Sequence, residues 1–62
     1  MELVFNNMKK RMRFCGDVAT LLKKLRVMRE EVVVKVNGHL APETRQIAAS
    51  DKVEVIKVVF GG

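Results

Sequence analysis

The chain has 62 residues, which is enough for one small domain and too few for a second core. Its 48% hydrophobic content is too high for a disordered tail, and its single cysteine excludes an internal disulfide framework and a cysteine-based zinc site. The net charge of +5 suits an acidic partner surface, a phosphate-bearing ligand or nucleic acid, and it is also an ordinary solubility charge.

The first seven residues predict a strand in which Leu3 and Phe5 share one face and Val4 lies on the other. Asn6-Asn7 predicts a turn, because asparagine tolerates positive φ. The two features together predict the first arm of an antiparallel hairpin.

The alternation in residues 11–15 predicts the second arm of this hairpin. Met12 and Phe14 would face the core, while Arg11, Arg13 and Cys15 would face the other way. The hairpin is therefore expected to have one buried face and one basic face.

An amphipathic helix of about three turns is predicted next, beginning after Asp17 and ending near Arg29. Asp17 is a favourable N-cap, and its carboxylate suits the positive end of a helix. The apolar stripe consists of Val18, Leu21, Leu22, Leu25 and Met28.

Residues 31–36 predict a β-branched strand that leads into Asn37-Gly38, a strong hairpin signal. Residues 39–41 predict a short return strand, which Pro42 confines to the edge of the sheet. Residues 43–50 are expected to be irregular.

Residues 52–60 predict the last and longest strand, and its strand character on both faces favours a central position. The predicted order is β-β-α-β-β-β, an α+β fold with one main helix on one face of a mixed sheet. The first and last strands must then lie side by side and parallel, so that the helix covers the apolar faces of both hairpins.

This order, ending in Gly61-Gly62, resembles the ThiS/MoaD family of ubiquitin-like, β-grasp sulfur carrier proteins, and the length is closer to ThiS. The resemblance covers nearly the whole chain as a single domain, residues 1–62, with a flexible Gly61-Gly62 tail. The segments that carry it are Asp17-Val18-Ala19-Thr20-Leu21-Leu22, Val34-Lys35-Val36-Asn37-Gly38, Asp51-Lys52-Val53-Glu54-Val55-Ile56 and Gly61-Gly62.

The resemblance implies that the chain is a protein co-substrate and not an enzyme. A ubiquitin-activating-type enzyme would adenylate the carboxylate of Gly62 with ATP, and a sulfur donor such as a cysteine desulfurase would convert it to a thiocarboxylate. The sulfur acceptor would be thiazole synthase in thiamin biosynthesis or, alternatively, the large subunit of molybdopterin synthase. The domain itself would bind no cofactor.

The two terminal glycines suit this chemistry, because without a Cβ they can thread a narrow channel into a partner's active site. The other interpretation is a frayed end, which terminal glycines often are. The pattern upstream favours the functional interpretation.

Alternation along the last strand predicts an apolar patch on the sheet face away from the helix. Its members are Val4, Val33, Ile56, Val58 and Phe60, and we expect them to bind the partner enzymes. A shift in register or a bulge would instead place some of them inside.

Arg11 and Arg13, with Lys9 and Lys10, form a basic cluster that either complements an acidic partner or is simply solvated. No aromatic residue is placed to stack bases there, so we expect no nucleic acid as a partner.

Cys15 is expected to be a small buried hydrophobe, and His39 a solvated loop residue. No metal site is predicted, because His39 lacks companions at ligand spacing. A single cysteine and the lack of a signal peptide predict a cytoplasmic location, and no apolar run approaches a membrane span. The free protein is expected to be a monomer.

Three function classes stay open at this point: a sulfur carrier, a modifier joined to protein lysines through Gly62, and a small basic binding domain. Transfer-RNA thiolation is a further acceptor pathway for a sulfur carrier. The sequence of the carrier does not distinguish the pathways, because the acceptor belongs to the partner.

Overall fold

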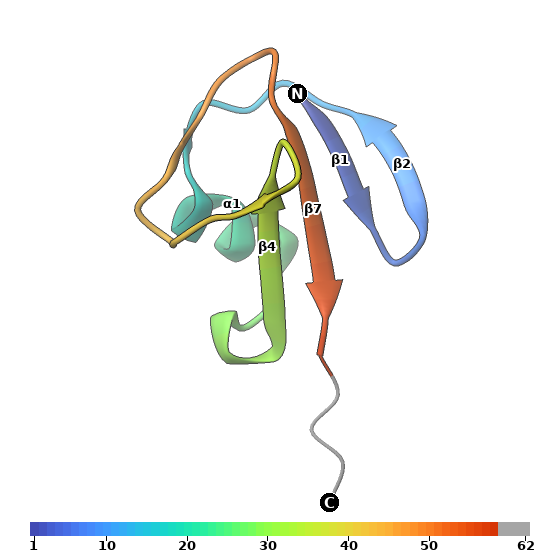
Figure 1. Cartoon of the computed structure of the whole chain (residues 1–62), viewed down its shortest axis with the longest axis vertical. Helices are drawn as coiled ribbons and strands as arrows, with labels where there is room; N and C mark the ends of the chain where they lie inside the picture. The colour runs from blue at the N-terminus through green and yellow to red at the C-terminus, as the bar shows by residue number, and fades with distance from the viewer. Residues whose placement is uncertain (59–62) are drawn as a thin grey trace, which may run out of the picture.

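A five-stranded mixed sheet carries one helix on one face in the computed structural model, which describes residues 1–58 (Figure 1). The strand order is β2-β1-β7-β4-β5, with a separate two-stranded pair, β3-β6. The elements are β1 (Glu2–Phe5), β2 (Met8–Arg11), β3 (Gly16–Asp17), α1 (Val18–Leu25), the short 3₁₀ turn η1 (Arg29–Glu31), β4 (Val32–Val36), β5 (His39–Leu40), β6 (Gln46–Ile47) and β7 (Lys52–Lys57). The predicted β-grasp class is confirmed.

The central strand is β7, which pairs parallel to β1 and antiparallel to β4. Leu3 lies opposite Val53, and Val34 lies opposite Val55. The prediction that the first and last strands are parallel neighbours is therefore correct. The strand β7 ends at Lys57, so Val58 is not part of it, contrary to the prediction. Residues 59 and 60, the rest of the predicted strand, lie outside the described residues.

The first hairpin turns at Asn6 and Asn7, whose φ angles are 53° and 62°. Because both turn residues adopt this left-handed conformation, the chain reverses at once and Met8 pairs with Phe5. The second strand is therefore β2, and the prediction of a strand over residues 11–15 is wrong. Met12 and Phe14 nevertheless pack against the core, as their alternation indicated.

The helix α1 begins after Asp17, whose side chain accepts a hydrogen bond from the Thr20 backbone N–H, as predicted. It ends at Leu25 and not near Arg29, because Arg26 adopts the left-handed conformation, with φ 60°. The N–H groups of Arg26 and Val27 then bond back to the last turn of the helix. Met28, predicted to belong to the apolar stripe, is consequently 60% exposed.

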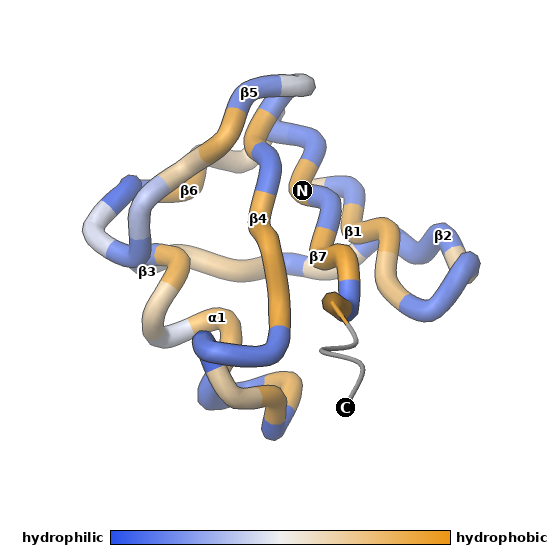
Figure 2. The backbone as a smooth tube through the Cα atoms, turned by 60° about the horizontal axis from the view of Figure 1, so that its bottom comes forward, coloured by the Kyte–Doolittle hydropathy of each residue, from blue (hydrophilic) through white to orange (hydrophobic). Residues whose placement is uncertain are grey.

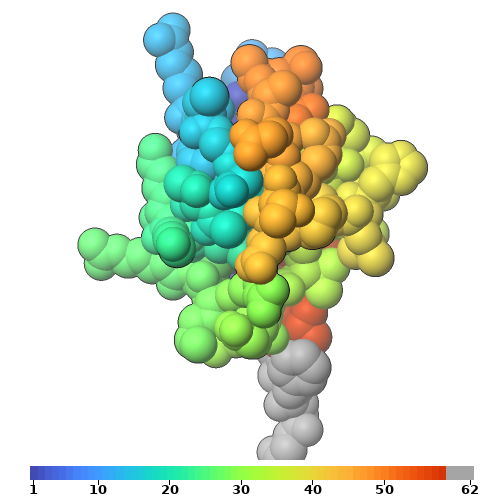
Figure 3. All heavy atoms as spheres, turned by 90° about the vertical axis from the view of Figure 1, so that its left-hand side faces the viewer, coloured from blue at the N-terminus to red at the C-terminus, as the bar shows by residue number. Residues whose placement is uncertain are grey.

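The second hairpin turns at Asn37 and Gly38, whose φ angles are 54° and 83°, as the Asn-Gly signal predicted. Its return strand, β5, lies at the edge of the sheet and ends before Pro42. The following segment is less irregular than expected, because β6 pairs with β3 and buries Ile47. Figure 3 shows this segment, in orange, lying against the teal residues at the start of α1.

The core lies between α1 and the sheet, and the apolar residues of β1, β4 and β7 contribute most of its sheet side (Figure 2). Leu21 of the helix and Val53 of the central strand are both fully buried. The buried hydrophobic residues are Leu3, Val18, Leu21, Leu22, Val34, Val36, Ile47, Val53 and Val55. The central strand is thus held from both sides and from the helix face.

Candidate functional site

The candidate site begins at the end of the central strand β7, which leads to the C-terminal residues. Val58, the residue after β7, donates its backbone N–H to the carbonyl of Glu31 at 2.7 Å. This bond continues the antiparallel pairing of β7 with β4 for one more residue. Phe60, Gly61 and Gly62, which the sequence singled out, lie outside the described residues.

Two other segments reach the same end of the sheet as Val58. Since β1 runs parallel to β7, its turn at Asn6 and Asn7 lies at this end, and η1 lies there because β4 begins where β7 ends (Figure 1). The segment that follows β7 therefore starts between a hairpin tip and a 3₁₀ turn.

The predicted apolar patch lies on the face of the sheet away from the helix, which we call the open face. Burial alternates along β7: Val53 and Val55 are buried, and Ile56 is 42% exposed. Val33 lies directly opposite Ile56, and both Val33 and Val4 are half-buried. The open-face patch (Val4, Val33, Ile56 and Val58) therefore exists without the register shift that would have placed its members inside. Its role as a binding surface stays a prediction.

Two residues of opposite charge, Glu54 and Lys35, adjoin the open-face patch, and the sequence analysis did not identify this pair. Glu54 of β7 lies between Val4 on one neighbouring strand and Lys35 on the other. The strand register is the signal that could have found this pair, because it places opposite charges on directly facing positions. Beside them, an open hollow of about 350 Å³ is lined by Val4, Asn6, Asn7, Glu54, Val55, Ile56 and Lys57.

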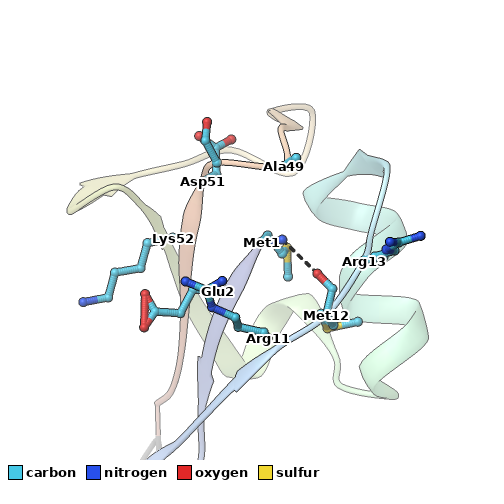
Figure 4. Close-up of a pocket in the computed structure, with 9 residues that line it drawn as sticks. Met1, Glu2, Arg11, Met12, Arg13, Ala49, Asp51 and Lys52 are labelled. Atoms are coloured by element: carbon cyan, nitrogen blue, oxygen red, sulfur yellow. Dashed lines mark hydrogen bonds between the residues drawn. The ribbon is translucent and has the colours of Figure 1, made fainter.

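The two arginines of the predicted site lie at the other end of the sheet. Arg11 ends β2, Arg13 follows it, and both line an open hollow of about 500 Å³ near Met1 and the start of β7 (Figure 4). From Lys52 to Lys57 the strand advances about 17 Å, which separates this hollow from the root of the tail. The structure therefore places Arg11 and Arg13 away from Ile56 and Val58, the members of the open-face patch nearest the tail.

The charged groups that line the hollow at Met1 do not converge on one point. Met1 donates its amino group to the carbonyl of Met12 at 2.8 Å, so this ammonium already has a partner. Figure 4 shows the side chains of Arg13 and Lys52 directed away from each other. Nothing in this arrangement corresponds to a catalytic cluster.

Asp51 joins the second hairpin to the turn that precedes β7. It accepts hydrogen bonds from the Ala48 backbone N–H at 2.7 Å and from Asn37 Nδ2 at 2.9 Å, while Arg45 lies 3.9 Å away. The bond from Ala48, followed by the bond from Asn37, holds the pKa of Asp51 below its ordinary value of 3.8, against the opposing effect of burial. Asp51 thus stabilises the start of the strand that carries the tail.

The carboxylate of Asp17 has a similar structural role at the start of α1. It accepts hydrogen bonds from Thr20 Oγ1 at 2.7 Å and from the Thr20 backbone N–H at 2.9 Å. The side-chain bond from Thr20 is the main cause of the lowered pKa of Asp17. Both perturbed carboxylates are therefore explained by folding and not by catalysis.

The structure corrects the prediction for Cys15, which is exposed and not buried. Because β2 already ends at Arg11, Cys15 lies on the connection to β3 and not on a strand face. His39 is exposed, as predicted, although it belongs to β5. Within residues 1–58, no group of three His, Cys, Asp or Glu side chains is arranged to hold a metal ion. In the same part of the chain, no helix has the length and apolar character needed to cross a membrane.

The comparisons with known proteins agree with this architecture. The crystal structure of the thiamine biosynthesis protein (ThiS) from Geobacter metallireducens is 26% identical, with a TM-score of 0.67 and an alignment covering 100% of both chains. No curated protein matches the sequence significantly. A family model described as the ThiS family matches residues 3–62, which is nearly the whole sequence. The protein therefore belongs to the ThiS family.

Proposed function

We propose that this protein is a sulfur carrier in thiamin biosynthesis whose reactive group is the carboxylate of Gly62. The observation that carries the proposal is the family match over residues 3–62, which includes both the folded domain and the Gly61-Gly62 tail. The likeness to the thiamine biosynthesis protein (ThiS) of Geobacter metallireducens favours the thiazole pathway over the alternatives.

The reaction begins with a carboxylate that is a poor electrophile, because it is anionic and lacks a leaving group. An oxygen of the Gly62 carboxylate attacks the α-phosphorus of ATP, and pyrophosphate leaves. The terminal sulfur of a donor persulfide then attacks the carbonyl carbon of the acyl adenylate, forming a carbon–sulfur bond while AMP leaves. A thiol attacks the donor sulfur of the resulting acyl disulfide, forms a disulfide with it and releases the acyl group with its own sulfur. The product is a thiocarboxylate, whose sulfur is passed to the thiazole precursor.

The domain acts in this scheme as a co-substrate that presents its own terminus. ATP is bound by a ubiquitin-activating-type enzyme, the sulfur comes from a donor such as a cysteine desulfurase, and thiazole synthase accepts it. Gly61 and Gly62 suit delivery into a partner's active site because neither has a Cβ. The pairing of β7 with β4 through Lys57, continued by the bond from Val58 to Glu31, supports the proposal, since it gives the tail a rigid root.

The partner enzymes bind the open-face patch, with Phe60 as its continuation toward the tail. Ile56 is its most exposed large apolar residue, and an apolar surface beside a reactive terminus is typical of a binding site. Arg11 and Arg13 add charge complementarity to an acidic partner surface, at a distance from the tail.

The experiment is ATP–pyrophosphate exchange catalysed by the adenylating enzyme in the presence of this protein. The complete chain supports exchange, and the chain lacking Gly62 does not. Addition of a sulfur donor, thiazole synthase and the carbon and nitrogen substrates of that enzyme then yields thiazole phosphate only with the 62-residue chain. Exchange that proceeds equally well without Gly62 would contradict the proposal.

A further inference from the structure

The strand β2 forms one edge of the five-stranded sheet, and within residues 1–58 it pairs with β1 alone. All four of its residues are exposed. The other edge strand, β5, has only two residues and is closely followed by Pro42, so it offers a poorer template for pairing. An exposed edge with free backbone groups is a site where another extended chain can add.

The hydrogen-bond pattern shows which backbone groups of β2 are free. Met1 and Met12 exchange both of their bonds, from the Met1 amino group to the Met12 carbonyl at 2.8 Å and from the Met12 N–H to the Met1 carbonyl at 3.1 Å. Antiparallel pairs alternate between bonded and non-bonded, so Lys10 bonds to β1 while Lys9 and Arg11 direct their backbone groups outward.

The same two positions are cationic, and their side chains share the open face with Val4 and Glu2, the residues opposite them. Lys10 adds a third charge on the other face of the strand. Glu2, opposite Arg11, is the acidic residue nearest in the register, and the ion pairs within residues 1–58 are Arg29–Glu43 and Arg45–Asp51. The edge therefore combines outward backbone donors and acceptors with an excess of positive charge.

This combination selects among the possible occupants. A second copy of the chain, pairing edge to edge, would place Lys9, Lys10 and Arg11 against the same cations. A nucleic acid would complement the positive charge. It would not form the hydrogen bonds of a neighbouring strand with the outward backbone groups of Lys9 and Arg11. An extended peptide with acidic side chains complements the charge and can also form these backbone hydrogen bonds.

We infer that the β2 edge binds an acidic, extended segment of a partner protein, which adds to the sheet as a further strand. The added strand bonds to the outward backbone groups of Lys9 and Arg11, and its carboxylates face the cationic side chains. This binding does not depend on the proposed tail chemistry. A failed peptide experiment would leave the function of Gly62 untouched, and the reverse also holds.

The test is amide hydrogen exchange, measured by NMR on the isotope-labelled complete chain, with a synthetic peptide of alternating Glu and Val. On saturation, exchange at the amides of Lys9 and Arg11 slows several-fold. Exchange at Lys10, whose amide already bonds to β1, stays unchanged and serves as the internal control. Added salt weakens the binding.

Two control ligands separate strand addition from attraction of any polyanion. The first is the same peptide with its central valines replaced by proline, which keeps the charge and cannot pair. The second is a single-stranded oligonucleotide. Neither slows exchange at Lys9 and Arg11. Equal protection by either one, or binding of the Glu-Val peptide that leaves both amides unprotected, would overturn the inference.

Two substitutions of Lys9 distinguish the contribution of its charge to binding from the contribution of its backbone N–H. Lys9→Gln removes the charge alone, and Lys9→Pro also removes an N–H that makes no bond within the sheet. Both weaken binding of the Glu-Val peptide, and Lys9→Pro weakens it several-fold more. Equal affinities of the two variants would overturn the inference. Should Lys9→Pro not fold, amide exchange in the parent protein with the Glu-Val peptide and the two control ligands still decides the test.

Discussion

The backbone N–H of Val58 donates to the carbonyl of Glu31 at 2.7 Å and ties the end of the central strand to η1. Glu31 immediately precedes β4, so this bond closes the pairing of β4 and β7 at the end where the tail begins. The reactive terminus of the proposed mechanism thus follows a segment of β7 that stays paired with β4 beyond Val55, where its pairing with β1 ends.

The first prediction concerns Ile56 of the open-face patch. Because Ile56 is 42% exposed and faces Val33 across the strands, Ile56→Lys changes the free energy of unfolding by about 1 kcal/mol or less. The same substitution places an unpaired charge in the proposed binding surface and lowers the rate of adenylation several-fold. Urea unfolding and ATP–pyrophosphate exchange measure the two effects.

Thr44→Lys is the matched control for Ile56→Lys, since Thr44 is also exposed and lies away from the open-face patch. It adds the same charge and leaves adenylation unchanged. Loss of folding in Ile56→Lys would refute the surface position of this residue, and unchanged adenylation would refute its role in binding.

The second prediction concerns the pH dependence contributed by Asp51. Its pKa in the folded protein lies below the ordinary 3.8 of the unfolded chain, first because of the bond from Ala48 and then because of the bond from Asn37. The contribution of Asp51 is therefore fully present above pH 3.8 and is lost as the pH falls through the lower, folded pKa.

Urea unfolding between neutral pH and pH 2 measures this effect. The Asp51→Asn variant is less stable than the parent protein at neutral pH, and the difference between the two shrinks in acid. If the difference in stability between the parent protein and Asp51→Asn grows in acid, the predicted direction of the pH dependence is wrong. Asp17→Asn supplies the comparison, because Asp17 also has a lowered pKa but caps the helix instead.

The third prediction concerns Arg26, which ends the helix with φ 60°. A side chain in the left-handed conformation costs about 1 kcal/mol, and glycine avoids this cost. Arg26→Gly therefore stabilises the protein by about 0.5–1 kcal/mol relative to Arg26→Ala, which keeps the strained conformation. Thermal unfolding of the two variants decides the matter, and a less stable glycine variant would contradict the assigned helix end.

Local signals with a direct stereochemical cause predicted much of this fold. Both asparagine turns and the Asp17 cap depend on one or two residues, and all three are present where expected. The parallel pairing of β1 with β7 followed from the need to cover both hairpins with one helix. The alternation along β7 likewise placed Ile56 on the open face.

The errors arose where two adjacent signals competed. The alternation of residues 11–15 suggested a strand, but the tight turn at Asn6 and Asn7 fixed the pairing at Met8, and this moved Cys15 off the sheet. The helical spacing reached Met28, but the chain left the helix at Arg26, a residue that the sequence gives no reason to place in the left-handed conformation. The pairing of β3 with β6 depends on tertiary contacts that no local pattern encodes.

The position of the transferred sulfur tests the central claim most directly. After incubation with ATP, the adenylating enzyme and a sulfur donor, intact-protein mass spectrometry with fragmentation locates any sulfur on the chain. We expect the exchange of one oxygen for one sulfur at Gly62, and no change in the chain that lacks Gly62. Sulfur gained instead as a persulfide on the exposed Cys15, or gained equally without Gly62, would contradict it.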